Sequence, residues 1–393
     1  MIEDLSTQND VSVTQIKLNF YRIVENENWW NVDIFIANLT STLQESSSST
    51  TVQLTKKGNR AFYNDLKSRP DLMKVNLGIN ILVIGGNKKG KPKSLNPALI
   101  NINEDGSVGY ETCDIGPKIK SKERLDPVGG FLDDHFVICG GFDSDKKPIP
   151  MKSDCEIIGK TESKVINMTA KGRQFASSLR LNASTMWIVG GRDEGYDLKS
   201  SEFITVDGST PGINLPFTVL GHCVIQYKAN ALLLIGGDQN EYWNKNTWII
   251  DPTNGFNLTK GPRLNQGRTY HSCGKMKDKY GNILIVVAGG NSLNSVEILN
   301  TKSMNTWIEG PKLPFDIESS SMVSTDDKVF LVGGESSNYA GNKNSVFELK
   351  SNLLEWKKIG VPIKELRYGH IAFIATKKGL EIFSGMKIIE CTT

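Results

Sequence analysis

Residues 268–314 read RTYHSCGKMKDKYGNILIVVAGGNSLNSVEILNTKSMNTWIEGPKLP and contain every part of a repeated pattern. Arg268 opens a short β-rich segment, a turn follows, and a hydrophobic run then ends in Gly289 and Gly290. A polar loop leads to a third β-rich segment, SVEILN, and a fourth begins with Trp307. No helical periodicity interrupts the pattern, so the segment predicts four short strands.

The same pattern recurs along the chain. Five further hydrophobic runs end in a glycine pair: ILVIGG, HFVICGG, TMWIVGG, ALLLIGG and KVFLVGG. The first glycines of successive pairs are 55, 50, 46, 53 and 44 residues apart, and a degraded seventh copy, LEIFSG, ends at Ser384-Gly385. An Arg lies 16 to 21 residues before most copies: Arg69, Arg124, Arg173, Arg268 and Arg367. The fourth and sixth copies have Val219 and Asp316 near that place instead.

A four-stranded unit that repeats about every 50 residues predicts an all-β fold, the β-propeller. Each small antiparallel sheet has two apolar faces and buries both only between neighbours in a closed ring. Seven glycine-ended strands predict seven blades. The alternative is six blades, with residues 366–393 outside the ring. The last copy lacks a fourth strand, so we expect the N-terminus, which carries Trp29 and Trp30, to supply it and close the ring.

This reading replaces the two or three average domains that 393 residues would allow. Residues 1–65 hold the closing strand and the Ser/Thr-rich stretch TSTLQESSSSTTVQ, which predicts an extended or disordered loop. Residues 66–393 hold the repeats. Twelve of the 37 glycines form the six pairs, and the apolar fraction of 38% suits thin layers between blades better than one thick core.

The order of features within each copy resembles the kelch repeat: a hydrophobic run, a glycine pair, a polar loop, Glu or Tyr, then Trp and Pro. The resemblance covers roughly residues 66–393 and places the chain near the superfamily of galactose oxidase and kelch-like proteins. It implies the propeller fold but leaves the activity open, because kelch propellers include actin bundlers, ubiquitin-ligase adaptors and a few enzymes.

Charge and hydropathy exclude several classes of partner. The net charge is +3, from 46 basic and 43 acidic residues, so we expect no dedicated nucleic-acid binding. No apolar run approaches the ~18 residues that span a bilayer, so no membrane partner is expected. The polar start, MIEDLSTQND, is not a secretory signal and predicts a cytoplasmic protein. A mature or incomplete N-terminus would leave secretion as the alternative.

Two further features bear on the compartment. Six cysteines lie at positions 113, 139, 155, 223, 273 and 391, and none forms a CxxC pair. Free buried thiols are favoured over disulfides, since isolated buried thiols are common in reduced compartments. Four N-glycosylation sequons begin at Asn38, Asn167, Asn182 and Asn257. They favour secretion only weakly, because a chain rich in Asn, Ser and Thr produces such tripeptides by chance.

Three of the four histidines fall at one repeat position: His222, His271 and His370. Strands at this position would be innermost, so the imidazoles could converge on a metal ion in the central channel. We favour the reading in which Arg-x-x-His is the repeat's own signature, and therefore expect no metal and no cofactor. Arg268 and the three histidines remain candidates for lining a channel that binds a small ligand.

The resemblance to galactose oxidase raises copper chemistry at Tyr270 and His271. The Cys/Tyr/His set that this enzyme needs has no match here, since Cys223 and Cys273 look like repeat positions.

Carboxylates on the third strand also recur: Glu156, Glu202, Glu297 and, one place later, Glu348. Their recurrence predicts a structural role beside the repeat Arg rather than acid–base catalysis.

The loops after the glycine pairs are the variable part of each copy. Charged groups beside Tyr and Trp in these loops suit a protein-binding surface. The candidate contacts are Arg192, Tyr196, Tyr242, Trp243 and Tyr339. We therefore predict a non-catalytic scaffold that binds a protein partner through one loop face. The alternative is a propeller enzyme or small-ligand binder that uses the central channel.

Overall fold

A computed structural model describes residues 79–87, 97–103, 108–114, 124–142, 151–159, 163–169, 172–239, 242–336, 345–359, 367–375 and 389–390. The chain divides into two compact units. One comprises Met1–Asn80 and Asn101–Asp105, and within it the Asn101 side chain donates to Oδ1 of Asn80 at 3.0 Å. The other comprises Ile81–Ile100 and Gly106–Thr393 and holds the propeller strands except for the ends of β1 (Ile79–Asn87) and β2 (Ala98–Ile102).

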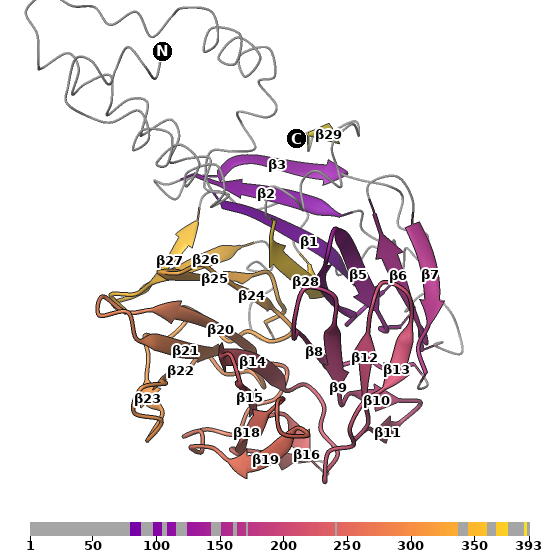
Figure 1. Cartoon of the computed structure of the whole chain (residues 1–393). Helices are drawn as coiled ribbons and strands as arrows, with labels where there is room; N and C mark the ends of the chain where they lie inside the picture. Colours follow the sequence, from indigo (N-terminus) through magenta and orange to yellow (C-terminus); the bar gives the residue numbers. More distant parts are fainter. Residues whose placement is uncertain are drawn as a thin grey trace, which may run out of the picture. The chain divides into compact units, whose positions relative to one another are not determined.

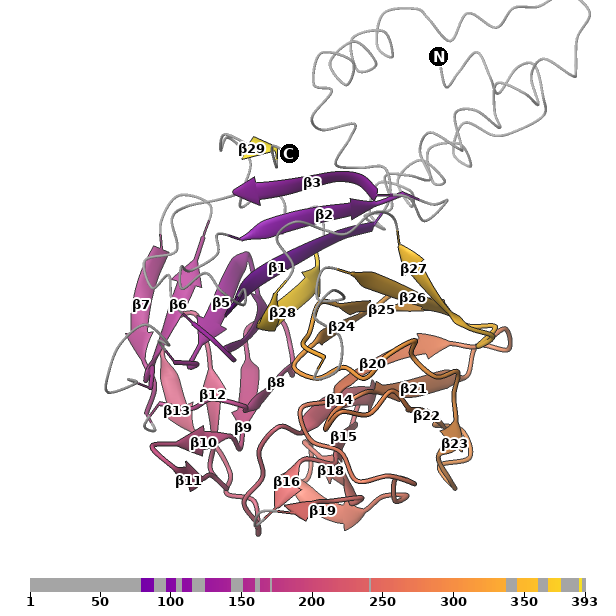
Figure 2. The same ribbon diagram turned by 180° about the vertical axis from the view of Figure 1, so that it is seen from behind.

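Every regular element among the described residues is a β-strand, and the main strands form six small antiparallel sheets, or blades (Figures 1 and 2). Blade 1 holds, in spatial order, β28 (Tyr368–Ile374), β1 (Ile79–Asn87), β2 (Ala98–Ile102), β3 (Val108–Asp114) and β29 (Ile389–Glu390). Blade 2 holds β4 (Val128–Leu132), β5 (His135–Cys139), β6 (Asp154–Ile158) and β7 (Ser163–Asn167). Blade 3 holds β8 (Ser177–Arg180), β9 (Met186–Val189), β12 (Ser201–Ile204) and β13 (Ser209–Pro211).

The remaining three blades follow the same plan. Blade 4 holds β14 (Cys223–Lys228), β15 (Ala231–Ile235), β18 (Thr247–Asp251) and β19 (Asn257–Lys260). Blade 5 holds β20 (Ser272–Lys277), β21 (Ile283–Ala288), β22 (Val296–Asn300) and β23 (Ile308–Glu309). Blade 6 holds β24 (Ser321–Ser324), β25 (Lys328–Val332), β26 (Val346–Lys350) and β27 (Trp356–Ile359). Within the part of the chain that is described, no helix could span a membrane.

Backbone hydrogen bonds link each blade to the next and show where the ring closes. The amide of the second glycine in every pair donates to a carbonyl oxygen of the following blade, over 2.7–3.0 Å. These bonds run from Gly86 to Arg124, Gly141 to Arg173, Gly191 to Val219, Gly237 to Arg268, Gly290 to Ile317 and Gly334 to Arg367. Arg367 directly precedes β28 of blade 1, so the sixth bond closes the ring. The prediction of seven blades is therefore wrong, and the six-blade alternative is confirmed.

The seventh copy does not form a blade of its own, because its inner strand belongs to blade 1. β28 pairs with β1, with Asn87 opposite Tyr368, and Nη1 of Arg367 donates to the carbonyl oxygen of Gly85 at 3.1 Å. The sequence-based reading had assigned Arg69 to that glycine pair. β28 thus lies in the ring, whereas the alternative had placed it outside. The expected N-terminal closing strand, Arg69 and Ser384-Gly385 lie outside the described residues.

The glycine pairs allow the close approach on which these links depend. Gly290 has φ +85°, and a Cβ at this position would lie 2.5 Å from the carbonyl oxygen of Thr269, in the segment just before the inner strand of its own blade. A left-handed backbone that touches another backbone suits only glycine. The apolar side chains pack between the blades, and among the described residues each of five clusters joins two neighbouring blades. Thin layers between blades therefore replace a central core.

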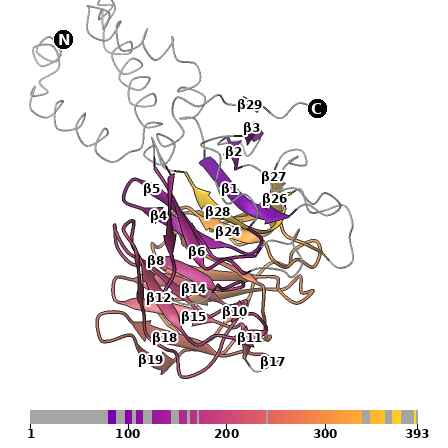
Figure 3. The ribbon, with the colours of Figure 1, turned by 90° about the vertical axis from the view of Figure 1, so that its right-hand side faces the viewer.

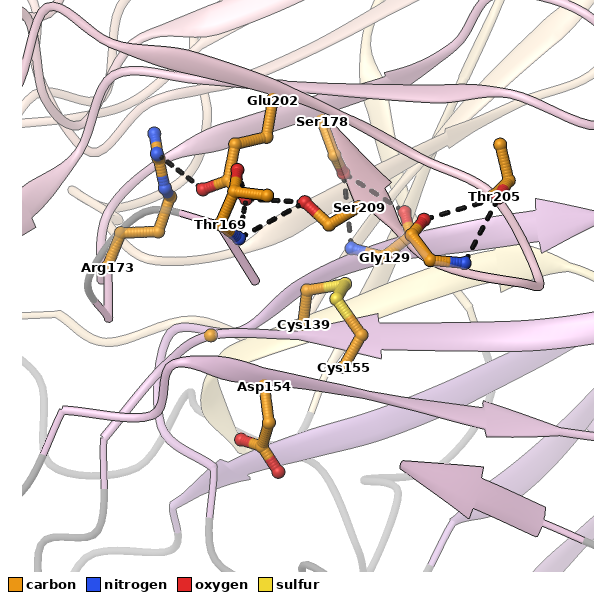
Figure 4. Close-up of a disulfide and its surroundings, with 12 residues drawn as sticks. Gly129, Cys139, Asp154, Cys155, Thr169, Arg173, Ser178, Glu202, Thr205 and Ser209 are labelled. Carbon is orange, nitrogen blue, oxygen red and sulfur yellow. Dashed lines mark hydrogen bonds and ion pairs between the residues drawn. A yellow bond between two sulfur atoms is a disulfide. The ribbon is translucent and has the colours of Figure 1, made fainter. Parts of the chain in front are cut away.

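Two disulfides contradict the expectation of free thiols. Cys139 and Cys155 face each other across β5 and β6, with their Cα atoms 4.0 Å apart (Figure 4). Cys223 and Cys273 join the innermost strands of blades 4 and 5, with their Cα atoms 6.2 Å apart. Sequence spacing alone could not show these pairings, because each depends on strand register or on blade contact. The side chains of Cys113 and Cys391 lie outside the description.

Candidate functional site

In the blades that have it, the repeat Arg is part of the structure of the blade. The Arg268 side chain is fully buried, and its Nη1 donates to the carbonyl oxygens of Gly289 at 2.9 Å and Ser295 at 2.8 Å. Its Nη2 pairs with Oε1 of Glu297 at 3.1 Å. The corresponding pair in blade 3, Arg173 and Glu202, is 2.8 Å apart (Figure 4). The predicted position of these carboxylates beside the repeat Arg is confirmed for both pairs.

The other two blades with predicted carboxylates use different partners. Nη2 of Arg124 pairs with Oδ1 of Asp154 at 3.0 Å in blade 2, where Glu156 is also fully buried. In blade 6, which lacks the repeat Arg, Oε1 of Glu348 pairs with Nζ of Lys328 at 3.0 Å. A buried carboxylate at this place thus lies beside a cation of its own blade.

The three repeat histidines lie between blades. Each ring packs against the first glycine of the preceding blade's pair: His222 on Gly190, His271 on Gly236 and His370 on Gly333. All three side chains are buried, and burial lowers the pKa of each imidazole to about 3. The rings therefore occupy three separate inter-blade layers. Among the described residues, no group of three or more His, Cys, Asp or Glu could hold a metal ion.

The buried imidazoles make stability depend on pH. His271 is neutral in the folded chain down to a pKa of about 3, whereas it is protonated below about 6.5 once unfolded, so its contribution to stability is lost as the pH falls. We expect His271→Gln to destabilise the fold near neutral pH, and the penalty to shrink by about 2 kcal/mol near pH 5. Urea unfolding of both proteins at the two pH values measures this, since the other histidines cancel. If the loss of stability in His271→Gln did not change with pH, the lowered pKa of His271 in the folded chain would be contradicted.

A ring of residues that the sequence did not reveal surrounds the propeller axis. In every blade, the residue two positions after the Arg site, which Val219 occupies in blade 4 and Ile317 in blade 6, has φ between 52° and 59°: Asp126, Phe175, Gly221, Tyr270, Ser319 and Gly369. Five backbone hydrogen bonds of 2.8–3.0 Å join these residues in sequence around the axis. We call them the inner ring. The glycines in LGH and YGH were the available signal, but the other blades place different residue types at this position.

The inner ring brings a carboxyl group and a phenol into a partly buried setting. Burial raises the pKa of Asp126 to about 7 and, together with nearby carboxylates, raises the pKa of Tyr270 to about 12. Arg192 opposes the shift at Tyr270, which shows that the inner ring lies close to the loops after the glycine pairs. The Tyr270 ring meets Phe175 edge-on, with ring centroids 4.9 Å apart. Both polar groups are therefore protonated or readily protonated near neutral pH, and could donate hydrogen bonds to a ligand.

Two small hairpins follow the glycine pairs of blades 3 and 4. The first is β10 (Arg192–Asp193) with β11 (Tyr196–Asp197), and the second is β16 (Asp238–Gln239) with β17 (Tyr242–Trp243). Each base is joined by a β-bridge to the segment just before the inner strand of its blade, Arg192 to Gln174 and Asp238 to Leu220. In the side view of Figure 3, β10, β11 and β17 are labelled on the same side of the ring.

The two hairpins carry most of the predicted contacts. Tyr196 is 78% exposed and Trp243 is 61% exposed, whereas Arg192 is half-buried and its Nε donates to Oδ1 of Asp197 at 2.7 Å. Tyr242 lies in β17, with its side chain outside the description, and Tyr339 lies outside the described residues. We call the surface formed by Arg192, Tyr196, Asp238 and Trp243 the hairpin face.

No protein-family model matches the chain, and no curated protein matches it. The kelch resemblance therefore rests on the repeat motif alone.

Proposed function

We propose that this chain is a non-catalytic, kelch-type scaffold that binds a protein partner through the hairpin face. The observation that carries the proposal is the pair of exposed aromatic side chains, Tyr196 and Trp243, on hairpins of neighbouring blades. Aromatic residues are enriched at interfaces and often supply most of the binding energy. A fixed charge pair, Arg192 with Asp197, lies at the base of the first hairpin and suits the polar surroundings of such an anchor.

The hairpins are held in place before any partner binds. Gly267 of the linker to blade 5 lies so close to Trp243 that a Cβ there would collide with the Trp243 carbonyl oxygen. The Asn244 side chain donates to the carbonyl oxygen of Gly237 at 2.9 Å and accepts from the amide of Asn246 at 2.7 Å. A surface that is already ordered loses little conformational freedom on binding, which favours affinity.

A small-ligand binder or enzyme that uses the central channel is the second candidate. Asp126 and Tyr270 of the inner ring support it, because both offer hydrogen-bonding groups near the axis. We rank it second because the candidate channel residues Arg268, His222, His271 and His370 are buried in contacts within or between blades.

We expect Trp243→Ala and Tyr196→Ala each to weaken partner binding by about 2 kcal/mol, or roughly 30-fold in Kd. Affinity capture with the full chain as bait, followed by mass spectrometry, identifies the partner, and surface plasmon resonance then measures the Kd of each variant. The matched control is Tyr280→Ala, since Tyr280 is 76% exposed in the turn between β20 and β21, at the opposite end of the blades. Equal Kd values for all three variants and the unmodified chain would overturn the proposal.

A further inference from the structure

The two disulfides point to the compartment in which the chain folds. Cys139 and Cys155 are fully buried between strands, and Cys223 with Cys273 ties two blades together. Disulfides form and persist in oxidising compartments and are rare where thiols are kept reduced. Four of the six cysteines are paired in this way. The pairing therefore favours the secreted alternative over the predicted cytoplasmic location.

The second, independent feature is the placement of the N-glycosylation sequons. Three of them fall on described residues, and the asparagine of each is exposed: Asn167, Asn182 and Asn257. Asn167 ends β7, and the sequon's Thr169 is bonded to Glu202 through both its amide, at 2.9 Å, and its hydroxyl, at 3.1 Å. We do not assign a glycan to Asn167, because the hydroxyl of Thr169 is hydrogen-bonded to Glu202 of the neighbouring blade.

Asn182 lies in the turn between β8 and β9 with its sequon in a compact conformation. Oδ1 of Asn182 accepts from the amide of Ser184 at 3.0 Å and from its hydroxyl at 3.3 Å. These bonds occupy the oxygen of the carboxamide and not its nitrogen, Nδ2, which is the atom that accepts a glycan. The turn is also held by the preceding blade, because the amide of Asp133 in blade 2 donates to the carbonyl oxygen of Ala183 at 2.7 Å.

Asn257 begins β19, the outermost strand of blade 4, and its sequon's Thr259 is also exposed. β18 runs away from the glycine pair of its blade and β19 returns, so Asn257 lies at the end of the blade opposite the pair. Asn182 also lies at that end, since β9 runs from it towards Gly190. Glycans on both residues would therefore leave the hairpin face uncovered.

We infer that the chain is N-glycosylated at Asn182 and Asn257, in the oxidising compartment where its cysteines pair. In each transfer, C1 of the sugar breaks its bond to the diphosphate of a lipid-linked oligosaccharide and bonds to Nδ2, which loses a proton, and the lipid diphosphate leaves. In each disulfide, two thiols lose two protons and two electrons to the disulfide of a thiol oxidoreductase, which becomes a dithiol. The inference stands apart from partner binding.

The native full-length chain, purified from its source cells, provides the first test. Treatment with peptide N-glycosidase in ¹⁸O-water converts each glycosylated Asn into a heavier Asp, so we expect this mass change at positions 182 and 257. Alkylation of the denatured chain should also spare Cys139, Cys155, Cys223 and Cys273 until a reductant is added. Unmodified Asn182 and Asn257 peptides would overturn the glycosylation, and immediate alkylation of the four cysteines would overturn the compartment.

Substitutions of the sequon hydroxyl provide the matched control. We expect Ser184→Ala and Thr259→Ala, in the full chain expressed in the source cells, each to lose one glycan and migrate faster on a denaturing gel. Ser184→Thr and Thr259→Ser keep the sequon and should migrate like the unmodified chain. Because migration is read after denaturation, a change in stability does not affect the result. Equal migration of the alanine variants and their controls would overturn the assignment.

Discussion

Replacing Arg268 with Met should lower the free energy of unfolding by about 3–5 kcal/mol, because a buried carboxylate loses its cation. Arg268 is fully buried, and the exposed fraction of the Glu297 side chain is 2%. The same guanidinium also satisfies the carbonyl oxygens of Gly289 and Ser295. Met fills a similar volume, so the loss would come from the unpaired charge and the orphaned carbonyl groups rather than from a cavity.

A double-mutant cycle separates these two contributions. Arg268→Met with Glu297→Met removes the whole ion pair, and we expect it to recover part of the stability, since a buried pair can often be replaced by apolar residues at little cost. The control is Lys277→Met, which breaks an exposed pair with Asp326 at 3.0 Å and should cost less than about 1 kcal/mol. Urea unfolding measures the unmodified chain, Arg268→Met, Glu297→Met, the double variant and the Lys277→Met control. If Arg268→Met cost no more than Lys277→Met, the buried pair would not stabilise the blade.

The sequence was sufficient to predict the structure of a single blade, but it was not sufficient to predict the number of blades. Strand positions and the pairing of Arg173 and Arg268 with Glu follow from a pattern that repeats within about 50 residues, so local spacing determines them. Ring closure is different, because Arg367 bonds to Gly85 across 282 positions. Nothing within the last copy distinguishes an inner strand for a seventh blade from an inner strand for blade 1. Only the six inter-blade bonds settle that choice.

Part of the candidate site could likewise be predicted from the sequence, and part of it could not. A glycine pair marks where a strand ends, so the exposure of Tyr196 and Trp243 in the following loops could be predicted. The inner ring could not, because a left-handed residue is identified from sequence mainly by glycine, and Asp126, Phe175 and Tyr270 occupy that conformation here. The pairing of Cys223 with Cys273 could not be predicted from the sequence either, since it depends on contact between neighbouring blades.

The glycine pairs allow a second large effect to be predicted. Gly290→Ala should lower the free energy of unfolding by about 2–5 kcal/mol, from a left-handed residue with a Cβ and from a steric clash. The added Cβ would lie 2.5 Å from the carbonyl oxygen of Thr269 and 2.9 Å from Cβ of His271. The backbone at Thr269, just before the inner strand, cannot separate from Gly290 without disturbing the bond from Gly290 to Ile317 that links blades 5 and 6.

Gly281→Ala isolates the clash from the other consequences of losing a glycine. Gly281 has φ +79°, close to the +85° of Gly290, but a Cβ there would have no atom within 4 Å. Both substitutions therefore carry a similar conformational strain and the same change in the unfolded chain, and we expect Gly281→Ala to cost only about 1 kcal/mol. Urea unfolding of the two variants gives the difference directly. Equal losses would mean that left-handed geometry alone selects these glycines, whereas a larger loss at Gly290 assigns the selection to the close approach of strands within the ring.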